Sequence, residues 1–160
     1  MGFCVASTRN GRGKARLTPA EQRGLALFKD PAKGNCAACH TADKGPDGSL
    51  PLFTDFSYDN LGVPRNPTLA HNRDAAYFDL GLCARAAGDL ASRRELCGAF
   101  KVPSLRNVAR TAPYFHDASA ERLEDAVRVM GRHQLGMELP ESDVTQIVAF
   151  LRTLDGEDAP

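Results

Sequence analysis

Two cysteines and a histidine stand together in a C-x-x-C-H pattern at residues 36–40, and these residue types can hold a cofactor covalently. In this pattern Cys36 and Cys39 form thioethers to the vinyl groups of a haem, and His40 ligates the iron. The spacing places both sulfurs on one helical turn, which also positions the imidazole. The segment therefore predicts one covalently attached haem c with His40 as its proximal ligand.

Two other chemistries use a C-x-x-C pair. A thioredoxin-like redox pair is one, but it expects a βαβ pattern around the cysteines, and none follows here. Half of a zinc site is the other, but the chain lacks a second C-x-x-C or an H-x3-H to complete it. Both remain alternatives to the haem interpretation, which we favour.

An iron held by one histidine needs a second axial ligand, a water or an open face. Spacing places Met130 on the apolar face of a helix, where a methionine can also be ordinary core, and Met137 lies in a following loop. A thioether ligand raises the reduction potential, whereas a second imidazole gives a lower one. The histidines outside the motif are His71, His116 and His133; we assign no role to the first and the last.

Size and charge limit the protein class. The 160 residues suit a single domain, which we expect over residues 18–156. Twenty basic and twenty acidic side chains cancel, so we expect no nucleic-acid partner. No apolar run has the length of a membrane span, so none is expected.

The two ends of the chain differ from this domain in composition. Residues 1–17 contain three arginines and one lysine and predict a mobile basic arm, while residues 157–160 predict a frayed tail. Haem is attached to C-x-x-C-H after export, which implies a periplasmic protein. Residues 1–16 do not have the apolar core of a signal peptide, so we expect the chain to be a piece of something longer. Cys4 receives no role.

Every clear periodicity is helical, so we predict an all-α domain of the class I cytochrome c type, with long loops around one haem. A helix begins after Thr18, with Pro19 at its first position and Glu21 closing a capping box, and runs to about Lys29. Residues 41–67 are rich in Gly, Pro, Asp and Asn, and we expect a loop rather than strands there.

Four further helical segments are expected. Residues 84–94 are weakly helical, and 103–110 predict one short helix. A clearer helix starts with Ser119 as its cap and ends at Gly131, the position of a C′ glycine. The last helix runs from about Glu141 to Leu154 and ends at Gly156.

Cys83 and Cys97 flank a short segment and predict a disulfide in an oxidising compartment. Arg106 is a candidate for binding a haem propionate, because a guanidinium matches a carboxylate in a two-pronged pair. Tyr114 is expected to pack beside the haem.

The stretch G-A-F-K-V-P-S-L-R-N-V-A-R-T-A-P-Y-F-H at residues 98–116 is highly distinctive. It resembles the C-terminal haem domain of the bacterial di-haem cytochrome c peroxidase/MauG family. The similarity continues through residues 123–130, 134–136 and 147–151, and upstream through 24–28, 36–40 and 60–64. It covers residues 18–156.

The resemblance implies a high-potential haem that accepts electrons and passes them to a second, peroxide-reducing haem. It implies that Met130 is the second iron ligand, where MauG proteins have a tyrosine, and that His116 lies near the distal side. Family members bind calcium through backbone carbonyls at positions matching Thr111 and Pro113. The other calcium ligands come from the missing domain, so we do not expect calcium here.

This chain departs from the family pattern in having one C-x-x-C-H and no tryptophan. We therefore expect single-electron transfer through one haem, with small redox proteins or a second haem domain as partners. The alternative is a peroxidase that reduces hydrogen peroxide, either at this haem with His116 assisting proton transfer or together with a missing second haem domain.

Overall fold

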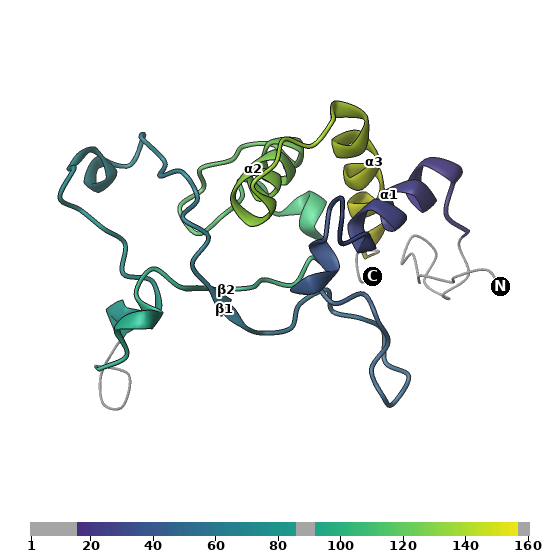
Figure 1. Cartoon of the computed structure of the whole chain (residues 1–160), viewed down its shortest axis with the longest axis horizontal. Coiled ribbons are helices and arrows are strands. Elements are labelled where there is room, and N and C mark those ends of the chain that lie inside the picture. The colour runs from purple at the N-terminus through teal and green to yellow at the C-terminus, as the bar shows by residue number, and fades with distance from the viewer. Residues whose placement is uncertain (1–15, 86–91, 157–160) are drawn as a thin grey trace.

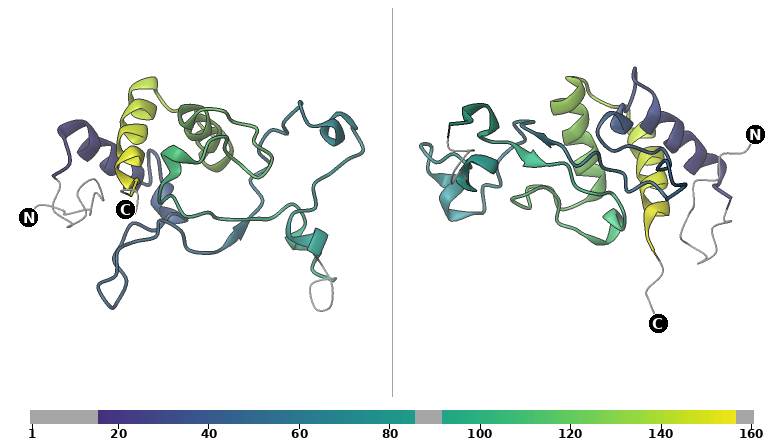
Figure 2. Two further views of the ribbon diagram at one scale, coloured as in Figure 1. Left: turned by 180° about the vertical axis from the view of Figure 1, so that it is seen from behind. Right: turned by 90° about the horizontal axis from the view of Figure 1, so that it is seen from below.

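The computed structural model describes residues 16–85 and 92–156. Its helical body contains α1 (Pro19–Lys29), α2 (Leu123–Leu135) and α3 (Glu141–Leu151). A long arm, described for residues 60–85 and 92–98, extends from one side of the body, with α2 nearer to it and α1 and α3 farther away (Figures 1 and 2). Short 3-10 turns occur at Cys36–Ala38, Ala70–Arg73, Leu82–Arg85, Arg94–Leu96, Val108–Arg110 and Arg152–Leu154.

Helix α1 begins as the sequence predicts. The Thr18 hydroxyl accepts a hydrogen bond from the Glu21 amide at 3.3 Å, and the Glu21 carboxylate accepts from the Thr18 amide at 2.7 Å. This reciprocal capping box satisfies two amides that a helix start otherwise leaves without partners. Pro19 follows at the first helical position, where its missing N–H is not needed.

The crossing of α1 and α3 depends on Gly24. A Cβ atom at this position would lie 1.9 Å from the carbonyl oxygen of Gln146 and 2.8 Å from Cβ of Phe150. Only a residue without a side chain therefore lets the two helices approach this closely. The contact brings residues from opposite ends of the chain together and closes the helical body.

Three aromatic rings fill the core beside this crossing. Phe28, Phe53 and Phe150 are at most 1% exposed, and their centroids lie 5.2–6.1 Å apart in edge-to-face pairs. Phe28 comes from α1 and Phe150 from α3, but Phe53 comes from the loop that follows the C-x-x-C-H segment. The loop thus contributes to the same core as the helices.

Helix α2 starts later than predicted. Its N-cap is Arg122, which makes no side-chain capping bond, so the expected cap at Ser119 is wrong. Ser119 instead uses its amide in a turn, donating to the Asp117 carboxylate at 3.1 Å. The local turn competes for the residue that the sequence marks as a cap.

The predicted end of α2 at Gly131 is also wrong. Gly131 is buried inside the helix, where an added Cβ would lie 3.0 Å from the Leu139 side chain. The helix ends at Gly136, whose φ of 64° is the left-handed conformation typical of a C-terminal glycine. Two glycines thus have different roles, one for close packing and one for the cap.

The last helix is close to expectation, since α3 runs into a 3-10 turn that ends at Leu154. The predicted short helix over 103–110 is reduced to the turn Val108–Arg110. Asn107 has a φ of 60°, which interrupts any helix before that turn. For residues 84–94, only the flanking turns are described, and 86–91 lie outside the described residues.

The 41–67 segment is a loop except for one short strand. Strand β1 (Tyr58–Asp59) pairs antiparallel with β2 (Phe100–Lys101), with Tyr58 opposite Lys101. This two-residue ladder departs from the all-α expectation, because two of the loop segments pair as strands. The expected basic arm, apart from its last residues, and Cys4 lie outside the described residues, as does the tail 157–160.

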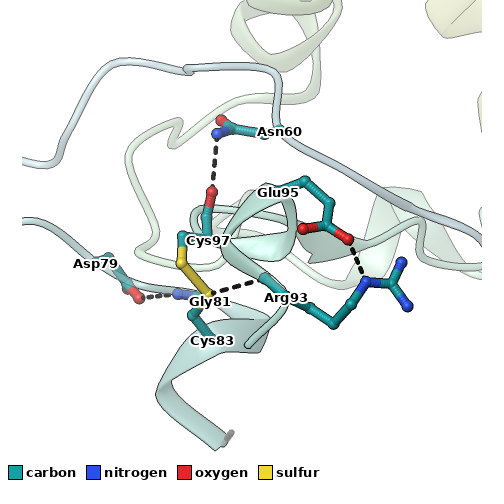
Figure 3. The surroundings of a disulfide bond; sticks show 7 residues. All are labelled: Asn60, Asp79, Gly81, Cys83, Arg93, Glu95 and Cys97. Carbon is teal, nitrogen blue, oxygen red and sulfur yellow. Dashed lines mark hydrogen bonds and ion pairs between the residues drawn. A yellow bond between two sulfur atoms is a disulfide. The ribbon is translucent and has the colours of Figure 1, made fainter. Parts of the chain in front are cut away.

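The predicted disulfide between Cys83 and Cys97 is confirmed, and it closes the base of the arm (Figure 3). Backbone bonds run beside it, from the Gly98 amide to the Leu80 carbonyl at 2.9 Å and from the Leu82 amide to the Ala99 carbonyl at 2.9 Å. The Asn60 side chain donates to the Cys97 carbonyl at 3.1 Å. The disulfide therefore links Cys83 to the end of the arm, and the hydrogen bond from Asn60 links the start of the arm to the same place.

We predict that Gly24→Ala destabilises the protein by about 1–3 kcal/mol, because the added methyl group overpacks the α1–α3 crossing. Helix propensity alone predicts the opposite sign, a gain of about 1 kcal/mol. Urea denaturation measures the change. The exposed neighbour Arg23→Ala is the control and should stay within about 0.5 kcal/mol of the parent; a more stable Gly24→Ala would contradict the crossing.

Replacing both Cys83 and Cys97 by serine should loosen the base of the arm. A closed loop of this size contributes about 3 kcal/mol in the chain-entropy model. Hydrogen exchange should then accelerate at the Leu82 and Gly98 amides, with Ser92→Ala as an exposed control on the same loop. Equal protection in the double variant and the parent would show that the hydrogen bonds suffice.

Candidate haem site

The C-x-x-C-H segment forms a single tight turn. Asn35, with a φ of 45°, turns the chain into the 3-10 turn Cys36–Ala38, and the His40 amide donates to the Cys36 carbonyl at 2.8 Å. Both cysteines are free thiols and half-buried. The turn thus presents two thiols and one imidazole from neighbouring positions, as covalent haem attachment requires.

The two thiols are in different environments. Burial raises the pKa of the Cys36 thiol to about 12. The pKa of Cys39 is also raised, first by burial and then by the negative charges of Asp55 and Asp59. Both groups therefore stay protonated at neutral pH, which disfavours a thiolate-based redox pair or zinc ligation without further help.

The His40 ring is held by a backbone carbonyl. Its Nδ1 lies 2.9 Å from the carbonyl oxygen of Phe53. Because a carbonyl oxygen only accepts, Nδ1 must carry the proton, and Nε2 is left with its lone pair free to bind a metal. Burial lowers the pKa of His40, opposed by hydrogen bonds to the backbone of Phe53 and Pro103, which favours the neutral ligand form.

Phe53 can reach His40 because its own backbone is in an unusual conformation. Its φ is 54°, in the left-handed region that residues other than glycine seldom adopt. The ring is buried in the aromatic core while the carbonyl accepts from His40 and, at 3.3 Å, from the Leu105 amide. A strained residue held on both sides is typical of a functional site.

The surroundings of the Arg106 guanidinium indicate a bound group. Its Nε donates to the Pro51 carbonyl at 2.9 Å, and its guanidinium carbon lies 5.1 Å from the centre of the Phe53 ring. Its two terminal nitrogens are buried and have no hydrogen-bond partner among the described residues. Burial also lowers the pKa of this guanidinium.

Buried donors without acceptors cost free energy, so this pair of nitrogens calls for an anionic acceptor. A haem propionate has the charge and the paired oxygens that a guanidinium binds best. The residues present therefore fit a haem c, with a thioether turn, a ligand imidazole and a cation for a propionate near one another in the fold.

The two methionine candidates occupy different settings. Met130 lies on α2 between the buried residues Val127 and Gly131 and is half-buried. Met137 follows the helix and is 40% exposed. A side chain on the packed face of a helix is better placed for a fixed axial bond than one on an exposed loop, so ligation by Met130 stays our prediction.

Tyr114 and His116 lie in other surroundings. Tyr114 packs against the edge of the core, and its pKa is raised, first by burial and then by the charge of Glu124. His116 stacks on the Phe100 ring with centroids 3.7 Å apart, and its Nε2 lies 3.7 Å from the Asp79 carboxylate. These contacts connect His116 to the base of the arm.

The sequence interpretation missed the residue that holds the His40 ring. Phe53 acts through its backbone carbonyl, which any residue type carries, so side-chain patterns give no signal for it. The partly buried apolar residues that pack against the core include Leu105 and, from the attachment turn itself, Cys36 and Ala37.

Comparison with known proteins places this arrangement in a family. The chain is 37% identical over 144 residues to the cytochrome c peroxidase Ccp of Escherichia coli K12, covering 90% of this chain and 27% of that protein. It is 31% identical to the methylamine utilization protein MauG of Paracoccus denitrificans, covering 89% of this chain and 44% of MauG. No protein-family model matches the chain.

A solved structure agrees with these relatives. The Y463M variant of the dihaem peroxidase BthA from Burkholderia thailandensis superposes with a TM-score of 0.75 at 33% identity, over 96% of this chain and 44% of that one. The chain belongs to the bacterial cytochrome c peroxidase/MauG family. It spans between about a quarter and just under half of the length of these family members.

The described residues offer neither a cluster of metal ligands nor a membrane-spanning helix. Across residues 16–85 and 92–156, no three His, Cys, Asp or Glu side chains gather into a metal site. The carbonyls at Thr111 and Pro113 belong to exposed residues. Within the same residues, none of the helices has the length and apolar character that crossing a bilayer requires.

We predict that Arg106→Met is more destabilising in haem-bearing protein than in protein made without haem attachment. The difference should be about 1.5–3 kcal/mol, the range for a hydrogen bond to a charged group. Thermal or urea unfolding of both forms measures it. Arg65→Met, which removes an arginine that donates to backbone carbonyls in the arm, is the control and should cost the same in both forms.

Equal costs of Arg106→Met in the two forms would argue against a propionate at this arginine.

Proposed function

We propose that this chain is a c-type cytochrome domain that carries one haem c and transfers single electrons. Cys36 and Cys39 hold the haem covalently, Nε2 of His40 ligates the iron, and Met130 supplies the second axial ligand. The hydrogen bond from His40 Nδ1 to the Phe53 carbonyl carries the proposal, because it leaves Nε2 unprotonated. Bound in this way, the haem supplies one-electron redox chemistry.

The rest of the site has supporting roles. Arg106 binds a propionate with its two terminal nitrogens, and Tyr114 packs against the edge of the core. A methionine ligand raises the reduction potential relative to a second histidine, which suits a domain that accepts electrons. Electron transfer needs little rearrangement here, because neither ligand has to leave the iron.

The partners that fit are a small redox protein as electron donor and a second haem domain as acceptor. The known relatives are two to four times longer than the matched region, and the BthA structure is named a dihaem peroxidase. A periplasmic location accords with thioether haem attachment and with the Cys83–Cys97 disulfide, since disulfides persist in oxidising compartments. Calcium is not part of this proposal.

Peroxide reduction is the second candidate function, because the relatives are named cytochrome c peroxidases. In that case Met130 leaves the iron or a separate haem domain supplies the reactive site. His116 would assist proton transfer, although its ring is already stacked on Phe100 and faces Asp79. Turnover of hydrogen peroxide by a homogeneous sample with a reduced donor would favour this alternative over simple electron transfer.

We predict that protein made with haem-attachment machinery has the mass of the polypeptide plus one haem.

Met130→Ala should abolish the methionine–iron charge-transfer band and lower the reduction potential, because a thioether ligand is lost. Met137→Ala is the matched control and should change neither. An unchanged spectrum in Met130→Ala together with loss of the band in Met137→Ala would assign the bond to the loop methionine.

A colourless protein with the mass of its amino acids alone would refute the haem proposal as a whole.

A further inference from the structure

Thr54 is a buried polar residue at the centre of several hydrogen bonds. Its exposed fraction is 4%, and only Thr153, at 1%, is another buried polar or charged residue among the described ones. The Thr54 hydroxyl donates to the Val102 carbonyl at 2.7 Å and accepts from the Phe56 amide at 3.0 Å. A buried hydroxyl with both functions satisfied is a strong local constraint.

The segments joined by Thr54 are those that face the His40 ring. Thr54 follows Phe53, whose carbonyl accepts from His40 Nδ1. Val102 precedes Pro103, whose backbone raises the pKa of His40. The Thr54 hydroxyl therefore links the two backbone segments that lie next to the imidazole. The two bonded residues, Thr54 and Val102, are 48 positions apart in sequence.

A third segment is tied to the same residue. The Thr41 hydroxyl donates to the Thr54 carbonyl at 3.0 Å, and Thr41 directly follows His40. Thr54 is therefore hydrogen-bonded to Thr41, the residue after His40, and to Val102, the residue before Pro103. The bonds of Thr54 hold the backbone directly after Phe53, whose φ of 54° is left-handed.

We infer that Thr54 is a positioning residue for the proximal histidine. It acts through the Phe53 carbonyl to fix the His40 ring and to set how strongly Nδ1–H is hydrogen-bonded. This inference rests on the proposed function in one respect, namely that His40 ligates a haem iron. A strongly bonded Nδ1–H makes the ligand more basic and stabilises oxidised iron.

The test compares Thr54→Val, which keeps the shape and removes the hydroxyl, with Thr54→Ser, which keeps the hydroxyl. Thr153→Val is a matched control, because Thr153 is also buried and its hydroxyl also donates to a backbone carbonyl at 2.7 Å, that of Phe150. Its bond lies within the backbone at the end of α3 and does not join the backbone of residues 53–54 or 102–103.

In haem-bearing protein, Thr54→Val should raise the midpoint potential, with an upper bound near a tenfold change in the one-electron equilibrium, about 59 mV. Thr54→Ser should restore the parent value. Thr153→Val should lower thermal stability without moving the potential. If both valine variants only lose stability and leave the potential unchanged, Thr54 has a structural role alone and the inference is wrong.

Nuclear magnetic resonance gives a readout that does not require haem. Exchange of the His40 Nδ1 proton with solvent should be faster in Thr54→Val than in the parent, in Thr54→Ser and in Thr153→Val. If the parent protein proves to carry no haem, the proposed function fails, but this measurement still decides whether Thr54 positions the ring. Equal exchange rates in all four proteins would overturn the inference.

Discussion

The contact on which this molecule depends is the hydrogen bond between Nδ1 of His40 and the carbonyl of Phe53. It decides which ring nitrogen carries the proton and therefore which one can bind a metal. Two thiols at the right spacing can attach a haem, but they do not orient the imidazole. That orientation comes from a carbonyl 13 residues away, in a loop rich in turn-forming residues. The orientation of His40 thus depends on the stability of this loop.

Phe53 connects the His40 ring to the helical core. Its ring packs edge-to-face with Phe28 of α1 and Phe150 of α3, while its carbonyl faces His40. The position of the ring depends in turn on how closely α1 and α3 cross at Gly24. A change at the crossing is therefore expected to reach His40 through Phe53, which belongs to both the core and the site. Such coupling follows from close packing, in which small displacements are transmitted rather than absorbed.

Features encoded in neighbouring residues could be predicted from the sequence, and features that depend on distant contacts could not. The capping box at Thr18 and the attachment turn are local patterns with a direct physical reason. The Cys83–Cys97 bridge followed from the pairing of two nearby cysteines. By contrast, Gly131 resembles a helix end until packing against Leu139 shows why a small residue is needed inside α2. The left-handed backbone of Phe53 has no side-chain signature, because packing of its ring and bonds to its carbonyl impose it.

Helix α2 bears on the choice between electron transfer and peroxide reduction. Arg128 on α2 pairs with Glu141 at the start of α3 at 2.6 Å, and Gly131 packs against Leu139 in the connecting loop. These contacts hold the backbone of Met130 in place, so an open iron face would require rotation of the methionine side chain rather than movement of the helix. A methionine side chain has the flexibility to rotate, but losing the thioether bond opposes it. The proposed ligand set therefore favours a domain that would keep both axial bonds and exchange electrons.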